Sequence, residues 1–153
     1  MLSRLELRKT LRRRRRAVGP SERLRAGRLM AGAASRQLFR RRHHHYTCFL
    51  SADGEIDTAP LLQSLLKRGR QIWLPCLGQP TLAFKHYRPG VHMRSGAFGI
   101  REPATGPRSI RTPNAMDVVL MPLVGYDRHG NRLGMGGGYY DRTFAFRRWR
   151  RIW

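Results

Sequence analysis

A glycine-rich segment near the end of the chain has the features of an anion-binding loop. Its four glycines between positions 134 and 138 let backbone amides approach an anion closely, and Arg132 adds a planar charged donor. A helix is predicted to begin at Gly138 or Tyr139, and a helix N-terminus carries partial positive charge. The segment lacks the Lys-Ser/Thr pair of a Walker A loop and the register of a dinucleotide fingerprint. We expect it to bind phosphate, although a glycine run can also be a flexible turn.

Asp141 lies about one turn inside this predicted helix, where its carboxylate could meet a cation that bridges bound phosphates. Mg²⁺ prefers oxygen ligands and is usually held by one or two carboxylates, several waters and the nucleotide itself. We therefore expect Asp141 to bind Mg²⁺. The alternative is a first-turn aspartate that complements the helix dipole or pairs with Arg142.

Basic residues near the N-terminus form a second candidate phosphate site. Arg8, Lys9, Arg12 and Arg13 are spaced three and four residues apart, which places their charges on one side of a predicted helix. That side suits a triphosphate. The run 14–16 extends the arginines around the helix, so a solvated face or a nucleic-acid contact is the competing interpretation.

Two carboxylates lie in the segment that follows the first predicted strand. Asp57 is expected to cap the next helix, whereas the sequence gives Glu55 no structural duty. A carboxylate at this position can accept paired hydrogen bonds from an amino-heterocycle, so we expect Glu55 to contact a ligand. The run 43–45 contains three histidines that cannot converge on one metal ion from a regular element, and we assign them no role.

The elements that must position these residues begin with a pair of helices. Ser3 and Glu6 have capping-box spacing, which predicts a first helix from Arg4 to Ala17, and Ser21 is expected to cap the second. The remaining elements are expected in this order: strand 46–50, a helix from Asp57 or Thr58 to 66, strands 72–75 and 82–87, a turn-rich stretch 89–113, strand 118–122, a loop 123–138, and a last helix that carries Trp149.

This alternation predicts a single α/β domain with an open, mostly parallel sheet that helices flank on both faces. Ligands in such sheets collect beyond the carboxyl ends of the strands. The segments 51–58 and 123–141 should therefore form the site.

Composition limits the class of protein but does not choose a ligand. The 153 residues are 41% apolar, which fits one packed domain, and they carry a formal charge of +22. This surplus attracts nucleotides and nucleic acid alike, and its arginine bias can also reflect genome base composition. Cys48 and Cys76 lie in separate apolar runs and are expected to be buried thiols. Unpaired thiols of this kind favour a reducing cytoplasm as the location. No run approaches eighteen apolar residues, so we expect no membrane span.

Six blocks resemble the 5-formyltetrahydrofolate cyclo-ligase family, also called 5,10-methenyltetrahydrofolate synthetases. They cover nearly the whole chain in the right order, and the last is highly specific. The blocks are Lys9-x-x-Arg12 with the later arginines, Glu55-Ile56-Asp57-Thr58, Trp73-Leu74-Pro75, Arg101-Glu102-Pro103, the run 117–122, and the run 132–142 that contains Gly-Gly-Gly-Tyr-Tyr-Asp-Arg.

The resemblance implies an enzyme that uses ATP and Mg²⁺ to cyclise 5-formyltetrahydrofolate to 5,10-methenyltetrahydrofolate, with release of ADP and phosphate. It implies that Asp141 binds Mg²⁺, and that Glu55 binds the folate together with Met135, Gly136, Gly137, Gly138 and Tyr139. The ATP-binding residues that it implies are Lys9, Arg12, Arg13, Arg132, Leu133, Gly134, Met135, Gly136, Gly137, Gly138, Tyr139 and Tyr140.

The family normally continues past the last helix into a further strand and another acidic metal ligand. The chain ends at Trp153, so the residues 1–153 are interpreted as one cyclo-ligase-like domain without that segment. We expect a monomer whose partners are ATP and a reduced folate. A basic RNA-binding protein and an inactive truncated paralogue are the alternative hypotheses, and nucleic acid is the less favoured partner.

Overall fold

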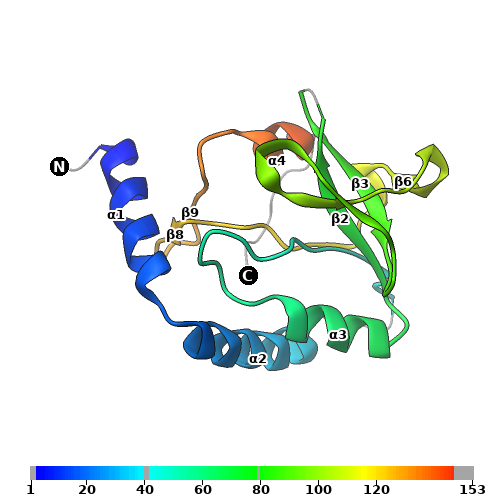
Figure 1. The fold of residues 1–153 in the computed structure, drawn as a ribbon, viewed down its shortest axis with the longest axis horizontal. Coiled ribbons are helices and arrows are strands. Elements are labelled where there is room, and N and C mark those ends of the chain that lie inside the picture. Colours follow the sequence, from blue (N-terminus) through cyan, green and yellow to red (C-terminus); the bar gives the residue numbers. More distant parts are fainter. Residues whose placement is uncertain (1–2, 40–41, 79, 147–153) are drawn as a thin grey trace.

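The computed structural model describes residues 3–39, 42–78 and 80–146. The helices and strands follow the predicted order (Figure 1). The expected position of Trp149 lies outside the described residues. The helices are α1 Arg4–Ala17, α2 Pro20–Gln37, α3 Ala59–Lys67 and α4 Tyr139–Thr143; the strands are β1 His45–Thr47, β2 Gln71–Leu77, β3 Leu82–Tyr87, β4 Met93–Ser95, β5 Arg101–Pro103, β6 Ile110–Arg111, β7 Val118–Val119, β8 Gly125–Tyr126 and β9 Arg132–Leu133.

The main sheet has the order β6-β3-β2-β1-β7. Strand β1 pairs in parallel with β2 and β7, whereas β3 is antiparallel to both β2 and β6. Four of the five strands therefore run in the same direction, which confirms the mostly parallel α/β sheet. Because β1 and β7 are parallel neighbours, the segments that leave their carboxyl ends emerge at the same edge.

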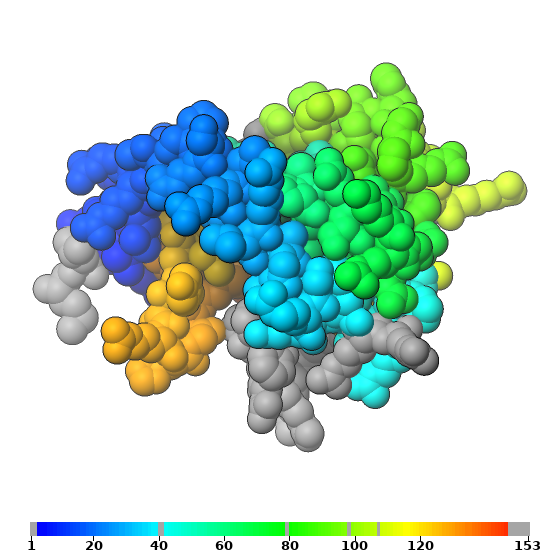
Figure 2. Space-filling model, turned by 90° about the horizontal axis from the view of Figure 1, so that it is seen from below, coloured from blue at the N-terminus to red at the C-terminus, as the bar shows by residue number. Residues whose placement is uncertain are grey.

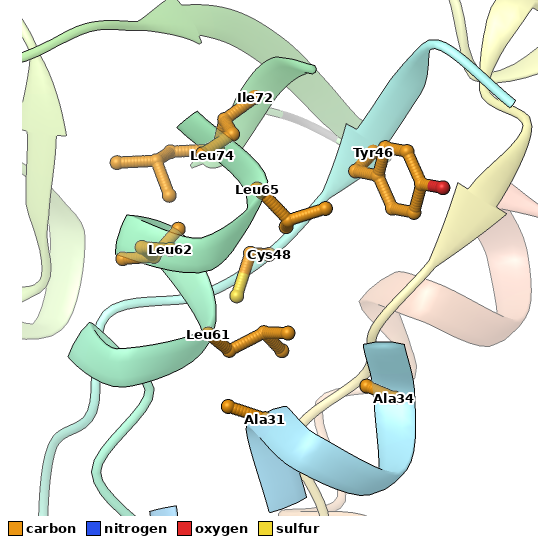
Figure 3. Packing of buried hydrophobic residues seen from close by; sticks show 9 residues of the cluster. All are labelled: Ala31, Ala34, Tyr46, Cys48, Leu61, Leu62, Leu65, Ile72 and Leu74. Atoms are coloured by element: carbon orange, nitrogen blue, oxygen red, sulfur yellow. The ribbon is translucent and has the colours of Figure 1, made fainter. Parts of the chain in front are cut away.

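Helices α2 and α3 cover one face of the sheet (Figure 1). The alternation of side chains along β1 and β2 directs Tyr46, Cys48, Ile72 and Leu74 to this face. They pack against leucines of α3 and alanines of α2, as Figure 3 shows. The small side chains of α2 let this helix lie close to α3.

The short helix α4 contributes to the core on the opposite face. The fully buried ring of Phe144 lies 5.8 Å from that of Phe84, and Trp73 and Met116 belong to the same cluster. The hydroxyl of Thr143 accepts a hydrogen bond of 2.8 Å from the backbone N–H of Leu82. Helices thus flank both faces of the sheet, as predicted.

The capping residues predicted from the sequence are found at the start of α1, but those predicted for α2 and α3 differ in the structure. The reciprocal Ser3–Glu6 capping box is present, and α1 has the predicted bounds. Gly19, rather than Ser21, is the N-cap of α2, because Pro20 already takes the first helical position. The N-cap of α3 is Thr58 rather than Asp57, but Asp57 accepts a 2.9 Å hydrogen bond from the N–H of Ala59, the first residue of this helix.

Several predicted segments have different bounds in the structure. Strand β1 ends at Thr47 instead of 50, and β7 comprises only Val118–Val119. The loop 123–138 contains a short antiparallel hairpin, β8–β9, which the sequence did not predict. Asp127 orders its turn by accepting hydrogen bonds from the backbone N–H groups of His129 and Asn131.

Candidate functional site

Helix α1 meets the glycine loop through Arg8. The Nε of Arg8 donates a 2.9 Å hydrogen bond to the carbonyl oxygen of Gly134. A Cβ added at Gly136 would lie 3.5 Å from the Arg8 guanidinium carbon, and the φ of +101° at this glycine disfavours any other residue. Arg8 is therefore the α1 residue that borders the loop, whereas Lys9 and Arg13 are exposed side chains of the same helix.

The loop leads directly into α4, which is shorter than the sequence suggested. Gly138 is the N-cap with a left-handed φ of 64°, and α4 spans five residues. A helix this short has a small macrodipole, so phosphate binding would depend more on loop amides and arginines than on the helix end. The guanidinium of Arg142 lies 5.0 Å from the ring centre of Tyr139.

Arg132 and Asp141, two predicted ligand-binding residues, form an ion pair with each other. The Asp141 side chain is 74% exposed, whereas that of Arg132 is 13% exposed. The predicted alternative partner, Arg142, instead donates to the carbonyl oxygen of Pro80. Asp141 thus lies beside the glycine loop with an accessible carboxylate.

A cation site built only from protein groups is not found in the part of the chain that the structure describes: no group of three or more His, Cys, Asp or Glu side chains could hold a metal there. The exposed carboxylate of Asp141 fits an ion that is held mainly by nucleotide oxygens and water, which is the usual arrangement for Mg²⁺.

The loop after β1 is attached to α1 by a cluster of charges. Asp53 accepts ion pairs from Arg12 at 2.9 Å, from Arg15 at 2.8 Å and from Arg16. Burial raises the pKa of Asp53, but hydrogen bonds from Arg16 and Arg12 outweigh it, so the pKa lies below its usual value. Arg12, which was expected at the ATP phosphates, is engaged by Asp53 instead.

Glu55 has a structural role that the sequence did not reveal. Its Oε1 lies 3.4 Å from Nη1 of Arg15, and its Oε2 accepts a 3.2 Å hydrogen bond from the N–H of Ala52. The expectation that Glu55 has no structural duty was therefore wrong. Glu55 is thus a mostly buried carboxylate, only 14% exposed, and each of its two oxygens has a partner within the protein.

Tyr140 brings an unsatisfied polar group into the same region. Its hydroxyl oxygen is buried and has no hydrogen-bond partner in the structure. Burial raises the pKa of Tyr140, the nearby Cys48 and Glu55 raise it further, and the charge of Arg132 lowers it, so the hydroxyl lies within electrostatic range of these three groups. A buried hydroxyl without a partner is costly in the free protein and fits a position that a ligand completes.

The structure thus gathers α1, the loop after β1 and the glycine loop, three segments far apart in sequence (Figure 1). The sequence analysis placed Arg8 on the candidate phosphate side of this helix but did not single out Arg15 from the arginine run. Only the positions of the glycine loop and of the loop after β1 in the structure distinguish Arg8 and Arg15 from the other arginines of α1.

The chain matches the sequence model described as "5-formyltetrahydrofolate cyclo-ligase family" over residues 1–151. The 5-formyltetrahydrofolate cyclo-ligase of Escherichia coli strain K12 is 37% identical over 136 residues, which cover 87% of this chain and 75% of that relative. The enzyme of the same description from Haemophilus influenzae is 44% identical over 98 residues, which cover 62% of this chain and 52% of the relative.

Two solved structures share the fold. The 5,10-methenyltetrahydrofolate synthetase of Aquifex aeolicus has a TM-score of 0.78 at 28% identity, and the match covers 94% of this chain and 73% of that one. The 5,10-methenyltetrahydrofolate synthetase of Mycoplasma pneumoniae has a TM-score of 0.71 at 18% identity, with 98% and 82% covered, and at this identity it supports the fold alone.

Proposed function

Because the chain belongs to the 5-formyltetrahydrofolate cyclo-ligase family, we propose that it is a ligase that converts 5-formyltetrahydrofolate to 5,10-methenyltetrahydrofolate with ATP and Mg²⁺. The observation that carries the proposal is the convergence of Arg8 and the glycine loop with Glu55 and the partnerless hydroxyl of Tyr140. One end of this arrangement suits phosphates and the other suits an amino-heterocycle.

The chemistry explains why ATP is needed. A formamide oxygen is a poor leaving group, so transfer of the γ-phosphoryl group to it releases ADP and activates the formyl carbon. The neighbouring folate amine then attacks this carbon and loses its proton. A carbon–nitrogen bond forms, the carbon–oxygen bond breaks, and phosphate departs. Catalysis depends mainly on positioning and on neutralising phosphoryl charge.

The nucleotide half of the proposed site comprises α1 and the glycine loop. Arg8 and Arg132 supply fixed charge at its border, and the loop residues 133–140 supply backbone amides. Lys9 and Arg13 remain proposed contacts at the outer, exposed side of α1. Arg12 remains a proposed contact as well; it is 36% exposed and pairs with Asp53 through Nε and Nη2, so a phosphate would share its guanidinium with Asp53.

Asp141 is the proposed protein ligand of Mg²⁺. It would exchange its ion pair with Arg132 for the ion, which frees Arg132 to face a phosphate. When bound to the nucleotide, Mg²⁺ supplies positive charge that offsets the phosphate oxygens.

The folate half comprises Glu55 and the aromatic residues that follow the glycine loop. A carboxylate accepts two hydrogen bonds from the amino group and ring N–H of a pterin, and Tyr139 and Tyr140 offer ring faces and a hydroxyl. We also propose a cytoplasmic location, which the two free buried cysteines support. Among the described residues no helix is both long and apolar enough to cross a membrane.

The direct test follows methenyltetrahydrofolate by its near-ultraviolet absorbance after the protein is mixed with Mg-ATP and 5-formyltetrahydrofolate. Asp141→Asn should lower turnover about 100-fold or more, because one charged metal contact is lost. Asp127→Asn is the matched control, since this exposed aspartate only orders the β8–β9 turn. Absence of turnover in the folded native protein, or equal rates in both variants, would contradict the proposal.

A further inference from the structure

Arg15 contacts several groups of the protein, whereas an arginine on a solvated helix face would point into water. Its guanidinium donates to the carbonyl oxygen of Asp53 at 3.0 Å, to the carboxylate of Asp53 at 2.8 Å and to the carbonyl oxygen of Leu123 at 3.2 Å. Its Nη1 also lies 3.4 Å from Glu55. One side chain of α1 thus joins the loop after β1 to the loop after β7, the two segments expected to form the site.

The burial of Arg15 separates it from its neighbours. Its side chain is 14% exposed, whereas those of Arg12 and Arg16 are 36% and 56% exposed. All three arginines contact Asp53, but of these three only Arg15 also forms an ion pair with Glu55 in the part of the chain that the structure describes. An ion pair at this depth is weakly screened, so it influences its partner more than a surface pair does.

The charges around Glu55 make this contact important. Burial raises the pKa of Glu55, the N–H of Ala52 and the guanidinium of Arg15 lower it, and the nearby Asp53 raises it again. The hydroxyl of Tyr140 on α4 lies within electrostatic range of Glu55 and is uncharged, because burial raises its pKa. Arg15 is thus the positive group that opposes two effects favouring the protonated carboxyl.

We propose that Arg15 is a positioning residue of the folate half-site, which holds the Glu55 carboxylate in orientation for the substrate without touching the substrate itself. The inference rests on the proposed function, because it assigns Glu55 to the folate. It adds a residue from the arginine run to the site and separates its role from phosphate binding.

Three variants distinguish this role from a general loss of charge. Arg15→Gln removes the positive group, and Arg15→Lys keeps the charge but cannot form the same set of contacts. Arg16→Gln removes an equal charge from the same helix and the same Asp53 partner without a contact to Glu55. In Arg15→Gln, the KM for 5-formyltetrahydrofolate at pH 7.5 should rise about tenfold, whereas the KM for Mg-ATP should change less than about twofold. Arg15→Lys should recover part of the loss, and Arg16→Gln should resemble the native protein.

A second readout does not depend on turnover. The chain contains only four glutamates, so ¹³C labelling of their side-chain carboxyl carbons allows the titration of Glu55 to be followed by NMR. The midpoint for Glu55 should rise in Arg15→Gln and stay near the native value in Arg16→Gln, and the pH above which folate binds should rise in parallel.

The outcomes separate this inference from the proposed function. An unchanged Glu55 titration in folded Arg15→Gln overturns the inference, and so does a shifted titration with an unchanged folate KM at every pH. A native protein that neither binds nor converts 5-formyltetrahydrofolate contradicts the proposed function and removes the folate role of Arg15, while the NMR titration still reports whether Arg15 controls Glu55.

Discussion

At the scale of single residues, burial decides which reactive groups are available. Cys48 and Cys76 are buried, and burial raises the pKa of each thiol to about 12. The neighbouring Glu102 carboxylate further disfavours the thiolate of Cys76. These cysteines therefore behave as small core residues, in agreement with the sequence prediction.

We predict that neither thiol reacts with a thiol-specific reagent in the native protein at pH 8. With a pKa near 12, only about one thiol in 10⁴ is ionised at this pH, and burial also excludes the reagent. Both thiols should react in 6 M guanidinium chloride. Rapid modification of the native protein, measured by the released chromophore, would show that the β1–β2 core opens more readily than the structure implies.

A second residue-scale prediction concerns the carboxylate that supports the β4–β5 hairpin. Glu102 is buried, 3.7 Å from Nζ of Lys85, and accepts a 2.7 Å hydrogen bond from Arg94. Burial raises the pKa of Glu102, but the bonds from Arg94 and Cys76 and the charge of Lys85 outweigh it, so the pKa lies below its usual value. A lowered pKa in the folded state means that Glu102 contributes stability above its unfolded pKa, near 4.5, and that this contribution is lost as the pH falls through the folded value.

Glu102→Gln should therefore lower the free energy of unfolding at pH 7 by about 2–4 kcal/mol, because Lys85 stays buried without its countercharge. The difference between the variant and the native protein should shrink below about pH 4.5. Urea unfolding at pH 7 and pH 3.5 measures both values. An equal difference at the two pH values would mean that the lost packing, rather than the charge, causes the effect.

At the scale of elements, close approach between α2 and the loop before α3 depends on Gly27. A Cβ at this position would overlap the carbonyl oxygen of Asp57, whose side chain accepts a hydrogen bond from the N–H of Ala59 at the start of α3. Gly32 lies on the same helix, but a Cβ there would meet only the flexible end of Arg36 at 3.8 Å. Close packing therefore requires a glycine at position 27 but not at position 32.

We predict that Gly27→Ala lowers the free energy of unfolding by about 2–3 kcal/mol, since α2 must move away from the Asp57 backbone. Gly32→Ala should raise it by about 0.5–1 kcal/mol, because alanine is the better helix former. Urea unfolding of both variants provides the comparison. Equal effects at the two positions would show that α2 does not pack as closely on the loop as the structure indicates.

The sequence predicted elements best where the determining contacts are local. The capping box belongs to α1 itself, and the strand-like run 82–87 forms β3, so both elements have the expected bounds. The hairpin β8–β9 was missed because its strands have two residues each and depend on the Asp127 turn. The link between Arg15 and Glu55 was missed because it joins positions 40 residues apart and becomes visible only when α1 and the loop after β1 are placed together.

At the scale of the whole molecule, the chain carries a formal charge of +22, and most of its 31 basic residues lie outside the proposed site. Most of the nine carboxylates are engaged inside the structure as caps or ion pairs, for example Glu6, Asp57 and Asp127. Helices α2 and α3 lie on the face that Figure 2 shows, where α2 carries four arginines against the single acidic residue Glu22, and α3 carries Lys67 and no acidic residue. Arg28 and Lys67 line a hollow of about 430 Å³ between these helices. Such a surface attracts polyanions whatever the activity of the site.

This surface gives a test that separates the ligase from the RNA-binding hypothesis. We predict that a 20-nucleotide single-stranded RNA binds tightly at 50 mM salt and only weakly, in the micromolar range or above, at 150–200 mM salt, because released counterions supply the driving force. Fluorescence anisotropy against salt concentration measures the slope. Replacing Arg28 and Lys67 with Gln should reduce the slope without changing turnover of 5-formyltetrahydrofolate, whereas Asp141→Asn should leave RNA binding unchanged. Nanomolar binding that persists at 200 mM salt and favours one RNA over another would instead identify RNA as a specific partner, because nonspecific charge alone does not survive screening at that strength.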